Sequence, residues 1–296
     1  MSKLYALLVG INDYPSPTAK LGGCLNDLGN AHDYLTSEFT DAAIVVLKDG
    51  EATRANVIEQ FRKHLGQAGS GDVAMFQYFG HGARATAVPE FHQFDLDDRD
   101  QGLVLIDSRL RDDTYDFADK ELALLIAELA AKDPHVALIL DCCHSGSGTR
   151  AIDDGPQVGV RTTTGRPTPR PLETYLDGQY AAMLKAGQPL AVPIGRHMLI
   201  AACTRDQKAK EYGDAPKGYF TTAFYDVLRK SGADISYADL FVRARAAVRQ
   251  AVRDTGVSDQ EPQFEPAAGF DAYAGFLGRA ARTARKTYSV ARRDAG

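Results

Sequence analysis

Four short apolar runs, separated by helical segments, constrain the fold of this chain most strongly. They are Tyr5–Gly10, Ala43–Leu47, Asp72–Phe79 and Val136–Leu140. Continuous apolar runs of this length are typical of buried parallel strands, and strands that alternate with helices are joined by right-handed crossovers. We therefore predict an α/β protein with a mostly parallel central sheet that is covered by helices on both faces, a three-layer α/β/α sandwich.

The remaining pattern predicts five helices and two shorter strands. The helices are expected at about 25–39, 53–65, 119–131, 221–230 and 237–253, and the strands at 103–106 and 197–202. The last residues, 279–293, are rich in Arg and Ala and are expected to form a solvated helix face or a tail.

Two chemically reactive side chains follow two of the predicted strands. His81 comes just after the third main strand, and Cys143 just after the fourth. In sheets of this kind the ligand site lies beyond the carboxyl ends of the strands. The strand pattern alone thus predicts that these two residues lie at one edge of the sheet.

Cys143 and His81 supply two of the three components that a cysteine peptidase needs, a thiolate nucleophile and a proton carrier. Gly82 has no side chain, so its backbone N–H can approach a substrate carbonyl closely. We therefore expect the N–H groups of Gly82 and Cys143 to form the oxyanion hole.

The neighbouring Cys142 is predicted to be structural. Strand residues alternate between faces, so Asp141 and Cys143 point the same way and Cys142 points to the other face. Cys142 then packs as a small hydrophobe. Asp141, beside the nucleophile, can pair with a basic side chain of a substrate.

The composition is that of an ordinary globular protein, with 44% hydrophobic and 25% charged residues among 296. The net charge is -5, whereas proteins that bind nucleic acid usually have an excess of Lys and Arg, so we expect no nucleic-acid partner. No apolar run approaches the roughly 20 residues of a membrane span, and no secretion signal is apparent. Four cysteines are too few for a disulfide scaffold, so we expect a reduced, cytoplasmic protein. If Cys143 and His81 perform peptidase chemistry, the expected partners are protein substrates.

Four segments resemble the motifs of metacaspases and their bacterial relatives, which are caspase-like cysteine peptidases. In order, they are Tyr5–Tyr14, Leu21–Asp27, Phe76–Gly82 and Leu138–Gly146. Two later segments, His197–Cys203 and Gly218–Phe224, resemble the small-subunit strand and helix of these peptidases more loosely.

The resemblance implies a caspase–haemoglobinase fold and a catalytic dyad of His81 and Cys143. It also implies an acidic specificity pocket, formed by Asp27 and Asp141, for Arg or Lys before the cut. The chain would then form one caspase-like domain in three parts: a large-subunit-like catalytic region at 1–148, a mobile inter-subunit loop at 149–195 and a small-subunit-like region at 196–296.

Some members of the family need calcium, and a dense acidic loop here contains Asp95, Asp97, Asp98 and Asp100. Carboxylate oxygens suit that ion. However, Lys120 interrupts the acidic pair expected near Asp119, and Arg150 follows the nucleophile where some calcium-dependent members have an acid. We therefore assign no metal ligand, leave calcium open, and keep a solvated charge run as the alternative. Phe79 replaces a Ser of some members and makes the pocket wall more apolar.

The inter-subunit loop holds five possible sites for activating cleavage, by the enzyme itself or by another protease. Its Pro, Thr and Gly content predicts an exposed, mobile backbone. Pro167 and Pro171 follow two of the five and disfavour cleavage there, and Arg150 lies close to the nucleophile in sequence. Arg161 and Lys185 are the better candidates; the other three are Arg150, Arg166 and Arg170.

Two other functions remain open at this point. One is a catalytically silent caspase-like domain that regulates or binds. The other is a flavodoxin-like nucleotide or phosphate binder, but Gly22-Gly23 lacks the Lys and Ser/Thr of a phosphate-binding loop.

Overall fold

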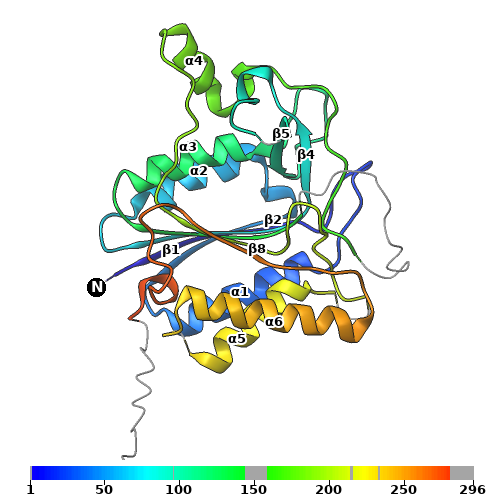
Figure 1. Ribbon diagram of the computed structural model, residues 1–296, viewed down its shortest axis with the longest axis vertical. Coiled ribbons are helices and arrows are strands. Elements are labelled where there is room, and N and C mark those ends of the chain that lie inside the picture. The colour runs from blue at the N-terminus through cyan, green and yellow to red at the C-terminus, as the bar shows by residue number, and fades with distance from the viewer. Residues whose placement is uncertain (1, 96, 144–158, 214–215, 233, 281–296) are drawn as a thin grey trace, which may run out of the picture.

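The structure, a computed structural model, describes residues 2–95, 97–143, 159–213, 216–232 and 234–280. Within these residues the chain forms three layers, with a central sheet between two layers of helices (Figure 1). The predicted sandwich with a mostly parallel sheet is confirmed.

The central sheet has six strands among the described residues, in the order β2-β1-β3-β7-β8-β9. All neighbouring pairs are parallel except β8 and β9, which are antiparallel. The strands are β1 (Leu4–Gly10), β2 (Ala42–Lys48), β3 (Val73–Phe79), β7 (His135–Asp141), β8 (Met198–Ala201) and β9 (Gln263–Pro266). β1, β3 and β7 lie inside the sheet and are almost wholly buried, which explains their continuous apolar sequences.

Helices cover both faces of this sheet. α2 and α3 lie on one face, and α1, α5 and α6 lie on the other (Figure 1). Their bounds are α1 (Cys24–Glu38), α2 (Arg54–Lys63), α3 (Asp119–Ala130), α5 (Tyr219–Ser231) and α6 (Tyr237–Thr255). Each layer has its own apolar core, and the sheet separates the two.

Two helices begin where the sequence provides an N-cap. The hydroxyl of Thr53 accepts a hydrogen bond from the N–H of Asn56 at the start of α2, and that of Ser236 accepts one from Asp239 at the start of α6. Such caps stabilise a helix start by about 1 kcal/mol. The helices therefore begin within two residues of the positions expected from the sequence.

A small antiparallel sheet of three strands lies beside the carboxyl ends of the central strands. Within the described residues its order is β4-β5-β6. The strands are β4 (Gly82–Thr86), β5 (Arg99–Leu103) and β6 (Phe117–Ala118). The short strand expected at 103–106 was therefore displaced: β5 ends at Leu103, because its partners β4 and β6 extend only that far.

The segment expected as a mobile loop, 149–195, is partly structured. Residues 149–158 lie outside the described part of the chain. From residue 159 on, the chain contacts β4 and residues 209–211, and then forms α4 (Gln179–Lys185). Apolar periodicity could not reveal this, because the segment is held by arginine side chains and backbone hydrogen bonds.

Candidate active site

The two reactive residues predicted from the strand pattern lie at neighbouring strand ends. β3 and β7 pair side by side, with Phe79 opposite Asp141 in the register. The chain leaves β3 through Gly80 and His81, and it leaves β7 through Cys142 and Cys143.

The imidazole of His81 is oriented by a backbone carbonyl. Its Nε2 lies 2.8 Å from the carbonyl oxygen of Ala19. A carbonyl only accepts, so Nε2 carries the proton and Nδ1 has a free lone pair. Nδ1 is buried and has no hydrogen-bond partner among the described residues. Burial lowers the pKa of His81 to about 4, so the ring is neutral and Nδ1 can accept a proton.

The N–H groups of Gly82 and Cys143 converge on one oxygen. Both donate a 3.1 Å hydrogen bond to the carbonyl oxygen of Arg161. This is the geometry expected of an oxyanion hole, whose donors lie about 3 Å from the reacting oxygen. The structure therefore brings together the two donors that the sequence predicted, and places a peptide carbonyl of the chain itself between them.

The Cys143 thiol is buried, with no exposed surface. Burial raises its pKa, whereas hydrogen bonds from the Cys203 thiol and the Thr162 hydroxyl lower it, and the net direction is downward. Cys142 packs in the apolar core on the α2/α3 face, and Cys143 packs in the core on the opposite face. The two cysteines thus lie on opposite sides of the sheet, as alternation predicts.

The guanidinium of Arg161 fills a closed acidic pocket. It pairs with Asp27, and its Nη1 lies 2.8 Å from Asp141 Oδ2. Glu211, which the sequence analysis did not single out, contributes a third carboxylate 3.1 Å from Nη2. Arg161 itself is wholly buried. Three carboxylates around one cation leave excess negative charge, and burial raises the pKa of Asp27 to about 7 against the opposing effect of Arg161.

Each acid of the pocket is held by the protein. The Gly218 N–H donates to Asp27 Oδ2 at 2.7 Å, the Thr221 hydroxyl donates to Asp141 Oδ2 at 2.5 Å, and the Gly22 N–H donates to Glu211 at 3.0 Å. A Cβ on Gly218 would lie 2.7 Å from Asp141 Oδ2 and 2.9 Å from Asp27 Oδ2. Only glycine fits at that position.

The backbone before Arg161 lies as an extra strand against residues 209–211. The Arg161 N–H donates to the Ala209 carbonyl at 2.9 Å, and the Glu211 N–H donates to the Gly159 carbonyl at 2.9 Å. Residues 209–211 are fixed from behind, because Lys210 Nζ donates to the Ser258 carbonyl at 2.6 Å. A rigid strand edge of this kind can bind an extended peptide by β-augmentation.

A family model for the caspase domain, peptidase family C14, matches residues 3–272. The chain belongs to the caspase-domain family. Its three-layer fold is therefore the caspase-like α/β/α sandwich, and its family is one of cysteine peptidases.

Several curated relatives of this caspase domain are metacaspases. Metacaspase-7 of Arabidopsis thaliana is 34% identical over 54% of this chain and 38% of its own length. Metacaspase-9 of the same plant is 31% identical over 60% of this chain and 57% of its own length. The chain thus spans only about half the length of such relatives. Another relative, inactive metacaspase-4 of Trypanosoma brucei brucei, is 30% identical over 48% of this chain and 40% of its own length.

A solved structure shares the fold. A protein of Geobacter sulfurreducens superposes with a TM-score of 0.63 over 94% of this chain and 97% of its own, at 22% identity. That likeness supports the caspase-like architecture alone. Within the described part of this caspase domain, no helix has the length and apolar character that a membrane crossing requires.

The part of the inter-subunit loop that follows Arg161, called the linker below, is hydrogen-bonded to β4 and to the residues around it. The Thr163 N–H donates to the Gly82 carbonyl at 3.1 Å, and the Thr86 N–H donates to the Arg166 carbonyl at 3.0 Å. A Cβ on Gly165 would lie 1.7 Å from the Arg84 carbonyl oxygen, so the linker can approach β4 this closely only with glycine there.

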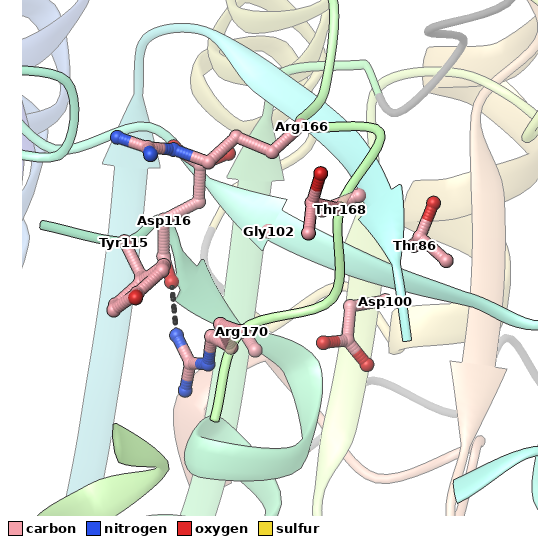
Figure 2. Close-up of a pocket in the computed structure, with 10 residues that line it drawn as sticks. Thr86, Asp100, Gly102, Tyr115, Asp116, Arg166, Thr168 and Arg170 are labelled. Atoms are coloured by element: carbon pink, nitrogen blue, oxygen red, sulfur yellow. Dashed lines mark hydrogen bonds between the residues drawn. The ribbon is translucent and has the colours of Figure 1, made fainter. Parts of the chain in front are cut away.

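Two linker arginines anchor the segment to the small sheet. Arg170 Nη1 donates to the Asp116 carbonyl at 2.9 Å, the dashed contact in Figure 2. Arg170 also pairs at 2.8 Å with Glu121, which is fully buried. The linker closes a cavity of about 20 Å³ beside Asp100, enough for about one water molecule.

The other candidate cleavage sites lie elsewhere. Arg166 donates to three backbone carbonyls, those of Arg111, Asp112 and Thr114, and the buried Arg170 holds Glu121. Lys185 is exposed at the end of α4 and belongs to no part of the site described above. Arg150 lies outside the described residues. Of the described candidates, only Arg161 has its carbonyl between the two oxyanion donors.

A lysine lies inside the acidic loop where a calcium ion was considered. The Lys120 ammonium lies 2.5 Å from Asp95, 3.1 Å from Asp100 and 3.2 Å from Asp119, and its side chain is 3% exposed. Among the described residues no cluster of His, Cys, Asp and Glu has a metal-binding arrangement. These acids do not fit calcium, because a built-in cation already holds them.

Proposed function

We propose that this chain is a cysteine endopeptidase that cleaves after Arg, or less efficiently after Lys, with Cys143 as nucleophile and His81 as proton carrier. One observation carries the proposal: Arg161 is placed as a substrate residue would be. Its carbonyl lies between the N–H groups of Gly82 and Cys143, and its side chain fills the acidic pocket.

Attack by the Cys143 sulfur on a carbonyl held in this position turns the carbonyl oxygen into an oxyanion. The two N–H donors already lie 3.1 Å from that oxygen, so they stabilise the developing charge without reorganisation. Removing one donor from such a site typically costs about 10²–10³-fold in kcat.

His81 moves the proton. Its Nε2–H is committed to Ala19, so Nδ1 accepts the Cys143 proton and returns it to the amine that leaves. His81 directly precedes Gly82, whose N–H holds the bound carbonyl. A water molecule then hydrolyses the acyl-enzyme.

Specificity for a basic residue follows from the three carboxylates, Asp27, Asp141 and Glu211. Arg is favoured over Lys because its planar guanidinium reaches all three acids at once, whereas an ammonium is a single point charge. An acidic residue before the cut would be repelled by the same pocket.

We propose further that the Arg161–Thr162 bond is the activating cleavage site. In the uncut chain Arg161 blocks both the oxyanion hole and the acidic pocket, so external substrates are excluded. A cut at this bond, by the chain itself or by another protease, frees the residues before it. The segment after it stays attached through Arg166 and Arg170.

We also propose that the peptidase works without calcium, in a reducing compartment such as the cytoplasm. The Lys120 ammonium supplies the positive charge between Asp95, Asp100 and Asp119. No disulfide joins the four cysteines, all of which lie in the described residues.

The decisive experiment measures hydrolysis of fluorogenic peptides that end in Arg, Lys or Asp. Wild-type protein should cleave after Arg, more slowly after Lys and not after Asp. Cys143→Ala and His81→Ala should abolish cleavage, and Cys142→Ala should retain it. A folded wild-type chain, cut at Arg161 and yet inactive on all the peptides, would identify a silent regulatory module instead.

A further inference from the structure

The residues after Arg161 lie along one edge of β4. β5 pairs with β4, and Gly82, the first residue of β4, also forms a parallel bridge with Thr162. Gly82 binds the backbone on both sides of the Arg161–Thr162 bond. Its N–H donates to the Arg161 carbonyl and its carbonyl accepts from the Thr163 N–H, each at 3.1 Å. This is the ladder of a parallel strand pair, so β4 can hold the peptide that follows the proposed cut in an extended form.

One extra residue in the linker makes a bulge opposite β4. Further along, the Thr86 N–H donates to the Arg166 carbonyl at 3.0 Å. Four steps along β4, from 82 to 86, are thus matched by five steps from 161 to 166. A bulge leaves one residue outside the ladder and bends the strand. Arg109 holds this bend, because its Nη1 donates to the Thr164 carbonyl at 2.6 Å.

The bend brings the fourth residue after the cut against the backbone of β4. A Cβ on Gly165 would lie 1.7 Å from the Arg84 carbonyl oxygen and 2.8 Å from the Ala85 nitrogen. Both are backbone atoms, which cannot turn aside as the end of a flexible side chain can. A residue other than glycine would therefore move the peptide off this edge and break its hydrogen bonds with β4.

The fifth residue after the cut has a pocket made of backbone carbonyls. The Arg166 guanidinium donates to three carbonyl oxygens, each at 2.8 Å, those of Arg111, Asp112 and Thr114. It also lies 5.5 Å from the centre of the Tyr115 ring (Figure 2). The Thr114 hydroxyl accepts from the Arg111 N–H at 3.1 Å and holds this loop closed. Three acceptors around one side chain suit the five N–H donors of arginine better than the ammonium of lysine.

The sequence carries this combination at one bond. The dipeptide Gly-Arg occurs three times, at 165–166, 195–196 and 278–279. Only the first has a basic residue five positions before its arginine, namely Arg161, whereas alanine stands at that position before the other two. The contacts after the cut therefore favour the same bond as the acidic pocket does.

We propose that the edge of β4 and the loop 111–114 form a substrate subsite that selects Gly at the fourth and Arg at the fifth position after the cut. The inference rests on the proposed function and names its substrate class. These substrates are proteins with an accessible Arg-Xaa-Xaa-Xaa-Gly-Arg segment, cleaved after the first Arg. In the uncut chain residues 162–166 fill the subsite. After the cut a substrate displaces them, while Arg170 still anchors the rest of the linker to Glu121.

The first test compares kcat/KM on internally quenched peptides, with wild-type protein that has been cut at Arg161. The parent peptide contains Val-Arg-Thr-Thr-Thr-Gly-Arg-Pro, one variant has Ala for the Gly, and another has Gln for the second Arg. Each variant should lose about tenfold or more in kcat/KM. A short peptide with a fluorophore directly after Arg reports on the residues before the cut alone. Equal kcat/KM on the three long peptides, in protein that cleaves the short one, refutes only the subsite.

A binding measurement decides the case in which the folded, cut protein cleaves no peptide, a result that refutes the proposed function. Arg166→Gln removes the chain's own arginine from the carbonyl pocket of 111–114. By fluorescence anisotropy, this variant should bind labelled Thr-Thr-Thr-Gly-Arg about tenfold or more tightly than the same peptide ending in Gln. The control is Arg196→Gln, which changes a half-exposed arginine paired with Asp133 and leaves Arg166 in the pocket, so it should show no such difference. Equal binding of both peptides by Arg166→Gln would overturn the subsite.

Discussion

The carboxylate of Glu211 contacts Arg161 at two nitrogens, Nη2 at 3.1 Å and Nε at 3.2 Å. It binds the edge of the guanidinium that Asp141, on Nη1, does not reach. The two residues are separated by 50 positions and meet because residues 159–161 and 209–211 lie side by side as strands.

Glu211→Gln should therefore weaken selection for Arg. We expect kcat/KM on an Arg-ending peptide to fall about 10- to 100-fold, since one of three partners of a buried cation loses its charge. The Lys-ending peptide should lose less, which would narrow the Arg/Lys ratio. Steady-state kinetics on matched peptides measure both. Glu59→Gln, on the exposed face of α2, is the control. An unchanged Arg/Lys ratio of kcat/KM in Glu211→Gln would show that this carboxylate does not contribute to selection of the basic residue.

Arg161→Gln should remove cleavage of the chain at its own linker. The glutamine lacks the charge that the acidic pocket binds, so the peptide bond is no longer held for attack. Intact-mass analysis should find fragments 1–161 and 162–296 in wild-type protein and the full chain in the variant. Lys185→Gln should cleave like wild type. Unchanged cleavage between residues 161 and 162 in Arg161→Gln would contradict the assignment.

His81 should make the fold sensitive to mild acid. Burial lowers its pKa from 6.5 to about 4, so between these values the unfolded chain binds a proton that the folded chain does not. Its contribution to stability is complete above about pH 6.5 and is lost as the pH falls toward 4. The free energy of unfolding of wild type, relative to His81→Asn, should therefore drop by about 2 kcal/mol from pH 7 to pH 5. Urea titrations at both pH values measure this difference. If the free energy of unfolding falls equally in the two proteins, the His81 ring is not buried in its neutral form.

Lys120 should replace the need for a metal ion. Wild-type activity should be unaffected by a chelator or by added calcium. Lys120→Met leaves Asp95, Asp100 and Asp119 without a cation, and breaking a buried ion pair costs about 3–5 kcal/mol. Its melting temperature should fall in chelator and recover in part with calcium. Lys132→Met, whose ammonium contacts only the Gly66 carbonyl among the described residues, should melt like wild type. Wild-type activity that requires calcium would contradict this role.

The central sheet and the positions of His81 and Cys143 at its edge could be predicted from the sequence, because both depend on local patterns. Apolar runs located β1, β2, β3 and β7, and the residues after β3 and β7 are His81 and Cys143. Strand alternation also separated Cys142 from Cys143. Asp141 was indicated both by its place beside Cys143 and by resemblance to a family, whereas the pocket role of Asp27 came from the resemblance alone.

Long-range contacts could not be found in this way. Glu211 lies in 208–212, where no apolar period marks an element, and its role depends on packing against residues 159–161. Likewise, the Pro, Thr and Gly content of the linker indicated an exposed loop. The segment is instead buried around Arg161, because a charged side chain finds three fixed carboxylates.

The segment around Arg161 that fills the acidic pocket is part of the same molecule. This affects how any inhibitor or activity probe will behave. A tethered ligand competes at an effective concentration that reaches about millimolar for short connections. A probe that binds the proposed cut form tightly would therefore bind the uncut chain far more weakly, although both forms contain His81 and Cys143. Labelling of a mixed sample would count the cut molecules rather than the total protein.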